Sequence, residues 1–298
     1  MALKSVTSLT VPCSLAFQDC FHPCTGVRIQ GSVPGGSQRF AVNFSCGEEP
    51  NCNIAFHFNP RFDQNAVVFN SFQNHGWQSE QVMAGNPFKH GASFLLEFHI
   101  TDQHFEVLVN KVVLGQFIHR IPLCEVKVLE INPEVEIQKI ELFLTRSGRG
   151  TPAAPMALKS VTGLTTPCVL AFDCGFQAGR HVRIQGSVPC GSQWFSVNFC
   201  CSDGPSCDIA FHFNPRLDQN CVVSNTFQNH SWQCNQTKEE NPFKHGASFQ
   251  LDIHMTEEHF EVLVNNNMFD RYSHRIPLCQ VKSLEVQPKV DIHKIEFF

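Results

Sequence analysis

A histidine, an asparagine and an arginine recur together at two-residue intervals in two places along the chain. The first set is His57, Asn59 and Arg61, which alternates with the apolar residues Phe56 and Phe58. Side chains two apart on an extended strand project from one face, so the three polar groups form a row of hydrogen-bond donors and acceptors. Such a row can bind a ligand rich in hydroxyl groups.

A tryptophan follows this row after a loop. Trp77 carries an apolar ring with one N–H, and Glu80 lies three residues beyond it. An indole can stack on a flat apolar surface while neighbouring polar groups bond to the edges of the ligand. A pyranose is such a ligand, and galactose fits well because its axial 4-hydroxyl leaves one ring face rich in C–H groups. The residue types therefore favour a galactose-like sugar.

The segments that must carry these residues have a hydrophobic period of two. Apolar and polar side chains alternate in residues 40–44, 54–59, 94–100 and 104–110, and clusters of Gly, Pro, Asn and Asp break the pattern. This pattern is typical of short antiparallel strands in a β-sandwich or jelly roll. No amphipathic helix is predicted, so the predicted fold class is all-β.

The chain contains two copies of one unit. Residues 1–143 align on residues 156–298 without a gap, and about 90 of the 143 aligned pairs are identical. Copies this similar must share one fold, and so long a period indicates two whole domains rather than a solenoid. Residues 144–155 are rich in Gly, Pro and small side chains without apolar periodicity, and they are predicted to form a short linker.

The spacing His-x-Asn-x-Arg, then Val-x-Asn, then Trp-x-x-Glu resembles the carbohydrate-recognition signature of the galectins. It is carried by His57, Asn59, Arg61, Val68, Asn70, Trp77 and Glu80. The similarity continues through residues 88–94 and 105–110, and the whole chain resembles a tandem-repeat galectin. The resemblance implies two galectin-like β-sandwich domains, each binding β-galactosides on its concave sheet without a metal ion or cofactor.

The resemblance also implies roles for the site residues. The His-Asn-Arg row would bond the galactose 4-hydroxyl, Trp77 would stack on the ring, and Asn70 and Glu80 would hold the 6-hydroxyl and the next sugar. Asp63 and Glu80 would both support Arg61 through ion pairs. Glycan hydrolysis usually needs two carboxylates that flank the scissile bond, so we predict a binding protein and not an enzyme.

The second copy keeps most of this set. Its equivalent residues are His212, Asn214, Arg216, Asn225, Trp232 and Asn235. Asn235 replaces Glu80, and charge-assisted hydrogen bonds are about twice as strong as neutral ones, so the second site is predicted to bind galactosides more weakly. On a neighbouring strand Arg39 and Trp194 occupy equivalent outward positions, where we expect them to contact longer glycans differently.

The cysteines and histidines do not indicate a metal site or a disulfide framework. The best candidate for a metal site is Cys20, His22 and Cys24, but the second copy has Gln177 and Gly179 in place of the last two. Only four pairs among the 15 cysteines recur at equivalent positions in both copies. We therefore expect reduced thiols that pack as small apolar residues.

Charge and hydropathy exclude several classes of protein. The net charge of −5 is spread over both copies, which argues against a nucleic-acid surface. The longest apolar runs are far shorter than the roughly 20 residues of a membrane-spanning helix, so no membrane insertion is expected. The first residues lack the apolar core of a signal peptide. We expect a cytoplasmic protein with leaderless, non-classical secretion.

We therefore predict a bivalent lectin that binds β-galactosides of the lactose or N-acetyllactosamine type. It would cross-link the glycoproteins and glycolipids that carry these sugars. The alternative is a galectin-like scaffold or structural protein in which one or both sugar sites have decayed. The sequence leaves open the preferred extended glycan, self-association and the packing of the two domains.

Overall fold

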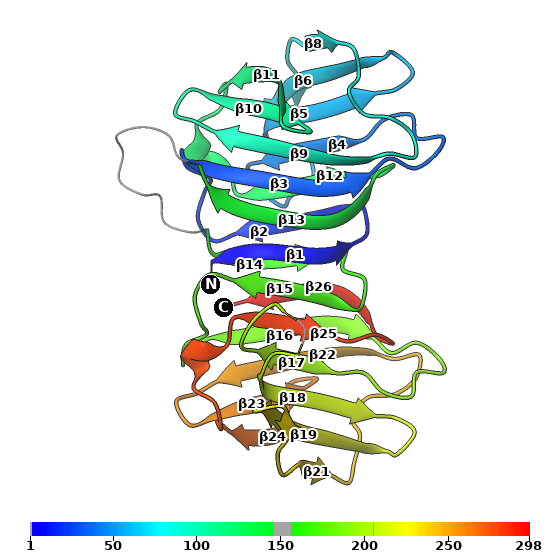
Figure 1. Ribbon diagram of the computed structural model, residues 1–298, viewed down its shortest axis with the longest axis vertical. Coiled ribbons are helices and arrows are strands. Elements are labelled where there is room, and N and C mark those ends of the chain that lie inside the picture. The colour runs from blue at the N-terminus through cyan, green and yellow to red at the C-terminus, as the bar shows by residue number, and fades with distance from the viewer. Residues whose placement is uncertain (1, 146–155, 205) are drawn as a thin grey trace. The chain divides into compact units, whose positions relative to one another are not determined.

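The computed structural model describes residues 2–145, 156–204 and 206–298 (Figure 1). Within these ranges the regular structure is antiparallel strands and two 3-10 helices, η1 (Leu123–Glu125) and η2 (Leu278–Gln280). The all-β prediction is thus confirmed. None of the helices in these ranges has the length and apolar character needed to span a membrane. Most of the predicted linker, residues 146–155, lies outside the described residues.

The chain divides into two compact units that differ from the sequence repeat at the first strand. The units are Leu9–Lys159 and Met1–Ser8 with Ser160–Phe298. Strand β1 (Leu3–Leu9) pairs antiparallel with β15 (Cys168–Phe172) of the second copy. Leu3 and Val6 are buried there, and the backbone N–H of Asp173 donates to the carbonyl of Ala2. Backbone pairing and apolar burial therefore place β1 in the unit of the second copy.

The unit Leu9–Lys159 contains two sheets. In spatial order, one sheet consists of β11 (Val112–Ile118), β10 (His104–Val109), β9 (Ser93–Ile100), β3 (Thr25–Ser32) and β13 (Glu136–Leu144). The other consists of β2 (Cys13–Phe17), β12 (Val128–Asn132), β4 (Ala41–Ser45), β5 (Ile54–Arg61), β6 (Ala66–Gln73) and β7 (Gly76–Trp77), with β8 (Gln81–Ala84) also paired to β6.

Phenylalanine rings from both sheets form the core of this unit. Phe44 on β4 packs against Phe98 on β9, with ring centroids 5.1 Å apart, and Phe56 on β5 stacks on Phe105 on β10 at 4.9 Å. All four rings are buried. Because inward side chains alternate with outward ones along a strand, this packing sends the polar residues of β4 and β5 to the opposite face.

The unit of the second copy repeats this arrangement. One sheet consists of β1, β15, β25 (Ser283–Val286), β17 (Val197–Cys200), β18 (Ile209–Arg216), β19 (Cys221–Gln228) and β20 (Ser231–Trp232), with β21 (Gln236–Lys238) also paired to β19. The other consists of β24 (Asn267–Ser273), β23 (His259–Val264), β22 (Ser248–Met255), β16 (His181–Ser187), β26 (Asp291–Phe297) and β14 (Leu158–Thr162). Phe211 stacks on Phe260 between the sheets at 4.6 Å.

Candidate functional site

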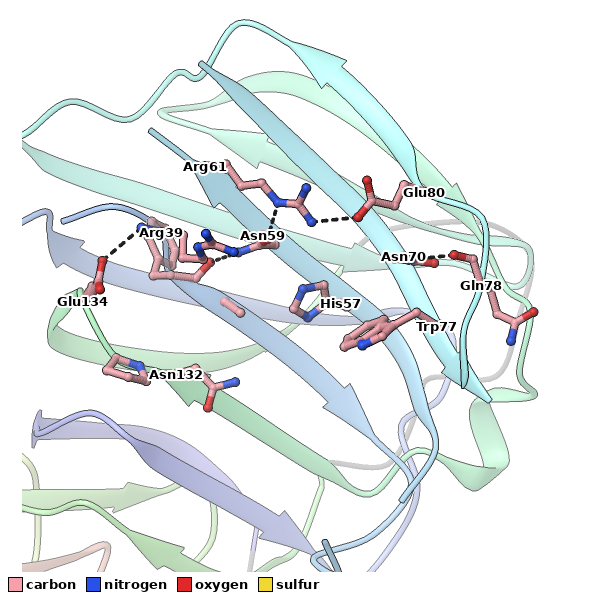
Figure 2. Close-up of a pocket in the computed structure, with 13 residues that line it drawn as sticks. Arg39, His57, Asn59, Arg61, Asn70, Trp77, Gln78, Glu80, Asn132 and Glu134 are labelled. Carbon is pink, nitrogen blue, oxygen red and sulfur yellow. Dashed lines mark hydrogen bonds and ion pairs between the residues drawn. The ribbon is translucent and has the colours of Figure 1, made fainter. Parts of the chain in front are cut away.

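A groove of about 530 Å³ crosses the outward face of β4, β5 and β6 in the first copy (Figure 2). It is lined by Arg39, Phe40, Ala41, His57, Asn59, Arg61, Asn70, Trp77, Gln78, Glu80, Asn132, Pro133 and Glu134. All seven side chains predicted for this copy's site, Arg39 included, therefore line one groove. Its volume lies in the range of small-ligand sites.

Strand register explains why these side chains meet. His57 on β5 lies opposite Asn43 on β4 and Asn70 on β6, so the three project from the same face. A separate bridge between Arg39 and Arg61 extends the row at the end of β5. Sequence-distant polar residues are thus brought together by pairing alone.

The guanidinium of Arg61 is fixed by three neighbours. Its Nε donates to Asn59 at 2.8 Å, its Nη1 to Gln64 at 3.3 Å and its Nη2 to Glu80 at 2.7 Å, the last an ion pair. Figure 2 shows the plane of the guanidinium held between Asn59 and Glu80. A guanidinium has five N–H groups, so two stay available for a ligand as far as the described residues go.

The expected ion pair between Asp63 and Arg61 is not formed. Asp63 is exposed, and the described contacts of Arg61 are those with Asn59, Gln64 and Glu80. Strand β5 ends at Arg61 and a turn follows it, so the two-residue alternation no longer applies to the residues beyond. The prediction for Asp63 was wrong for this reason.

Asn59 is a buried residue of β5 that accepts a hydrogen bond from Arg61. It is only 4% exposed, its Nδ2 donates to the carbonyl of Phe40 at 2.7 Å, and its oxygen accepts from Arg61. One N–H and one lone pair of this amide stay available beside the groove. Asn59 therefore orients the guanidinium and can add a hydrogen bond of its own.

His57 presents a defined tautomer. Its Nδ1 lies 2.7 Å from the amide oxygen of Asn43, whose Nδ2 donates to the carboxylate of Glu130 at 3.4 Å. Because an amide oxygen only accepts, Nδ1 must carry the proton, and Nε2 keeps a lone pair. Burial and the positive charge of Arg61 lower the pKa of His57 to about 4, so the ring is neutral at physiological pH. The ring can accept a hydrogen bond from a hydroxyl group.

The indole of Trp77 is 53% exposed although it is large and apolar. Its ring centroid lies 4.6 Å from that of His57 and 5.3 Å from that of Phe72, in T-shaped contact with the latter. These contacts position the indole at the edge of the groove, and Figure 2 shows it beside His57. An exposed and positioned aromatic face of this kind is a platform for a flat apolar ligand surface.

Asn70 belongs to the wall of the groove more than to its opening. It is 2% exposed, its Nδ2 donates to the carbonyl of Gln78 at 2.9 Å, and its oxygen accepts from Ser71 and Arg120. One N–H is left for a ligand. Arg120 also donates to the carbonyl of Ser79 at 3.0 Å, so it supports the segment between Trp77 and Glu80.

Three supporting residues were not singled out from the sequence. They are Asn43, Arg120 and Gln78. The sequence held a signal for Arg120, because residues 111–118 differ from residues 266–273 at every position while the following His-Arg pair is identical in both copies. Asn43 also stands at an outward position of a predicted strand.

The second copy rebuilds the inner half of this site. Nδ1 of His212 lies 2.7 Å from the oxygen of Asn198, and Asn214 accepts from Nε of Arg216 at 2.9 Å. Trp232 is 50% exposed, and its ring lies 4.7 Å from that of His212. Burial and the neighbouring Arg216 lower the pKa of His212 to about 4.

The outer half of the second site differs. Arg216 donates to Gln219 and has no ion pair with any described residue, while Asn235 donates instead to Thr237 at 3.1 Å. Asn225 occupies the wall as Asn70 does, donating to the carbonyl of Gln233 at 3.0 Å. The carboxylate that fixes the guanidinium in the first copy thus has no counterpart here.

Two neighbouring residues at the rim of the groove both differ between the copies. In the first copy the backbone N–H groups of Gln38 and Arg39 both donate to Glu134, which lowers the pKa of that carboxyl. In the second copy Trp194 replaces Arg39 and Lys289 replaces Glu134, and the ammonium lies 5.5 Å from the indole centroid. The second copy therefore has a cation–π contact between Lys289 and Trp194 where the carboxylate of Glu134 accepts two backbone hydrogen bonds in the first copy.

Comparison with known proteins decides the family. A model of the galactoside-binding lectins matches residues 12–142 and 167–297. The chain belongs to the galectins. Human galectin-4 is 34% identical over 292 residues, covering 91% of this chain and 90% of the relative. Mouse galectin-6 is 35% identical over 266 residues, covering 87% and 85%, and a 32 kDa beta-galactoside-binding lectin of Caenorhabditis elegans is 28% identical over 298 residues, covering 99% of each.

This galectin is of the tandem-repeat type, with two galectin domains of β-sandwich fold. The resemblance found in the sequence is confirmed. Membership of the family makes the chain a galactoside-binding lectin and not an enzyme. Its ligands are β-galactoside glycans.

Proposed function

We propose that this galectin is bivalent, with one galactoside site in each copy, and that it cross-links glycoproteins and glycolipids. The observation that carries the proposal is the duplicated framework of a neutral histidine, an amide-fixed arginine and an exposed tryptophan. Two linked sites bind a multivalent surface with a raised effective concentration. The predicted residues of both copies form these sites, and Arg39 and Trp194 contact longer glycans.

Each sugar contact follows from the groups available in the first groove. Nε2 of His57 accepts from the axial 4-hydroxyl of galactose, and the spare N–H groups of Arg61 donate to the same oxygen or its neighbour. The C–H face of the ring stacks on Trp77. The second oxygen of Glu80 and the spare N–H of Asn70 take the 6-hydroxyl and the next sugar.

We propose further that the second site is the weaker one. The basis is the guanidinium of Arg216, which lacks the anionic partner that Glu80 provides for Arg61. A less firmly held donor loses more conformational freedom on binding, and a neutral amide gives a weaker hydrogen bond than a carboxylate.

The test uses the full chain, because residues 1–8 belong to the unit of the second copy. Trp77→Ala and Trp232→Ala each remove one stacking face, with an expected cost of about 1 to 3 kcal/mol for lactose at the altered site. Both single variants should stay on lactose-agarose and lose agglutination of cells, while the double variant should lose both.

Two controls complete the test. Val113→Ala changes an exposed apolar residue outside the site, so agglutination reversible by lactose should persist. Undiminished agglutination by either single tryptophan variant would show that self-association supplies the valency. Failure of the unchanged chain to bind lactose-agarose would favour a scaffold with decayed sites.

The proposed location is the cytoplasm, with leaderless export to the glycans of the cell surface. Its support is the cysteine pattern, because thiols that do not recur as a disulfide framework in both copies are typical of a reducing compartment. The protein should appear in conditioned medium in the presence of an inhibitor of transport from the endoplasmic reticulum to the Golgi. Export abolished by that inhibitor would contradict the proposal.

A further inference from the structure

Three potential metal ligands lie together on the second copy, on the sheet opposite its sugar site. They are His181 on β16 and Asp252 and His254 on β22, and their ligand atoms all lie within 4.8 Å of one another. His181 and His254 are direct cross-strand partners. Asp252 and His254 alternate with the buried residues Ile253 and Met255, so both project from the outer face of the sheet.

The two imidazoles are already ordered side by side. Their rings are 4.6 Å apart and inclined by only 10°. The ring of Phe298 covers the other face of His181 at 4.2 Å and 7°. The two stacked imidazoles bring the nitrogen ligands of a chelating site together.

Asp252 provides an oriented oxygen ligand. It is 2% exposed, one carboxylate oxygen accepts from Nε of Arg183 at 2.7 Å, and the other accepts from Gln250 at 2.8 Å. A carboxylate oxygen has two lone pairs, so each oxygen keeps one for a metal ion. Bonds of this kind to a ligating carboxylate hold it in place around metal centres.

We propose that His181, Asp252 and His254 bind a divalent transition-metal ion of the zinc type. Two histidines and a carboxylate suit Zn²⁺, and three protein ligands plus water complete a tetrahedral shell. Ligand bonds of about 2.0–2.2 Å place two ligands of one ion roughly 3.3 Å apart. Closing from at most 4.8 Å needs a movement of about 1.5 Å, in which the imidazoles turn out of their stacked arrangement by rotation about their side-chain torsions so that both lone pairs face the ion.

The first copy lacks this cluster, because it has no histidine at the position of His181. Gly26, Glu97 and His99 stand at the equivalent positions. A Cβ added to Gly26 would lie 2.4 Å from the ring of Phe143, so a histidine does not fit unless that ring moves. In the second copy the equivalent ring, Phe298, lies flat on the histidine. The phenylalanine is the same in both copies and only the residue that faces it differs, so the first copy serves as an internal control.

The experiment is equilibrium dialysis of the full chain against Zn²⁺ at neutral pH after alkylation of accessible thiols, because 15 cysteines would otherwise bind the probe. Relative to the unchanged chain, His181→Phe should lose one bound ion while keeping a ring between its neighbours. His254→Gln should lose the same ion. His99→Gln removes the equivalent histidine of the first copy and should lose none.

A second measurement locates the ion. Zn²⁺ should protect His181 and His254 from diethyl pyrocarbonate, read by mass spectrometry, and should leave His99 unprotected. Retention on lactose-agarose and an unchanged circular dichroism spectrum show that each variant is folded. Equal Zn²⁺ stoichiometry in the unchanged chain and in folded His181→Phe, or modification of both histidines regardless of Zn²⁺, would overturn the proposal.

Discussion

The guanidinium of Arg61 lies between an amide and a carboxylate, whereas that of Arg216 donates to two amides and to no carboxylate among the described residues. The two grooves nevertheless share the same histidine tautomer and the same tryptophan exposure to within a few per cent. The inner side chains are fixed by strand pairing, which both copies keep, while the outer ones lie on segments after β6 and β19. The differences between the two sites therefore lie at the rim, and both copies keep the same fold.

A second contrast lies under β8 and β21. In the first copy Met83 and Phe69 pack over Gly115, whereas the second copy has Lys238, Ser224 and Asp270 at the same positions. Asp270 is 3% exposed, accepts from Ser224 at 3.0 Å and lies 3.6 Å from the ammonium of Lys238. An apolar cluster and a buried polar network thus fill equivalent space in one fold.

Among the residues that differ between the two sites, the carboxylate should have the largest effect on binding. Glu80→Asn, made with Trp232→Ala so that only the first site binds, should weaken lactose binding by about 1 to 2 kcal/mol, or roughly five- to thirtyfold. The figure is moderate because Glu80 is 42% exposed. Asn235→Glu, made with Trp77→Ala, should strengthen the second site by a similar factor.

Calorimetry with lactose on these full-length variants measures the exchange. The two single tryptophan variants give the reference affinity of each site. Equal affinities in the references, or no response to either exchange, would move the cause of any difference to the rim residues.

Removing the cation from the buried network should destabilise the second copy. Lys238→Met introduces the residue of the first copy but leaves Asp270 buried without its ammonium partner. The free energy of unfolding should fall by about 1 to 3 kcal/mol, since Asp270 keeps its hydrogen bonds from Ser224 and Gln236. Urea unfolding measures the loss, with Lys244→Met as an exposed control. Equal stability of the two variants would show that the network contributes little.

The rim residues should separate the copies on charged glycans. The guanidinium of Arg39 has no described hydrogen-bond partner, so it is available to an anion. Arg39→Trp, made with Trp232→Ala, should reduce binding of 3-O-sulfated lactose about two- to fivefold and leave lactose unchanged. Surface plasmon resonance with both sugars gives the ratio. A matching loss for lactose would place Arg39 in the galactose contact itself.

Acidification should not separate the copies, because both site histidines have a pKa of about 4. A lowered pKa keeps the imidazole neutral as the pH falls, so lactose affinity should change less than twofold between pH 7.5 and 5.5. An ordinary histidine at 6.5 would lose about tenfold there. Binding should fall only as the pH approaches 4. Isothermal titration at pH 7.5, 6.5 and 5.5 measures this, and half-loss near 6.5 would contradict the assigned environment.

The free energy of unfolding also depends on the protonation of His57 and His212, but over a wider pH range than lactose binding. Between pH 6.5 and 4 the unfolded chain binds protons at these histidines that the folded chain does not. Their contribution to stability is therefore complete above pH 6.5 and declines as the pH falls toward 4.

The sequence predicted the strands and the His-Asn-Arg row because both depend on local alternation, whereas Asn70 and Glu80 were identified by the resemblance to the galectins. Residues 54–59 lie within β5, and the polar row projects from the face opposite Phe56 and Phe58, as the two-residue period requires. The repeat supports the assignment of the tryptophan, because Trp77 and Trp232 stand at equivalent positions of the two copies.

Other features could not be predicted from the local sequence pattern, because they depend on where strands end and how they pair. Asp63 fails because the strand ends before it, and Asn43 acts through a cross-strand partner that only the register identifies. The His181 cluster joins residues 71 to 73 positions apart on two strands, so no sequence motif announces it. The placement of β1 is the most distant case, because its partner belongs to the other copy.

That first strand has a consequence for synthesis. β1 ends at Leu9 and its partner β15 begins at Cys168, about 160 residues later. At about 5–20 residues per second, the ribosome needs roughly ten to thirty seconds to make that interval. During this time Leu3 and Val6 have no β15 to pair with, while all the strands of the unit Leu9–Lys159 have been synthesised. A strand that precedes the rest of the first copy in the chain is therefore among the last to complete its pairing.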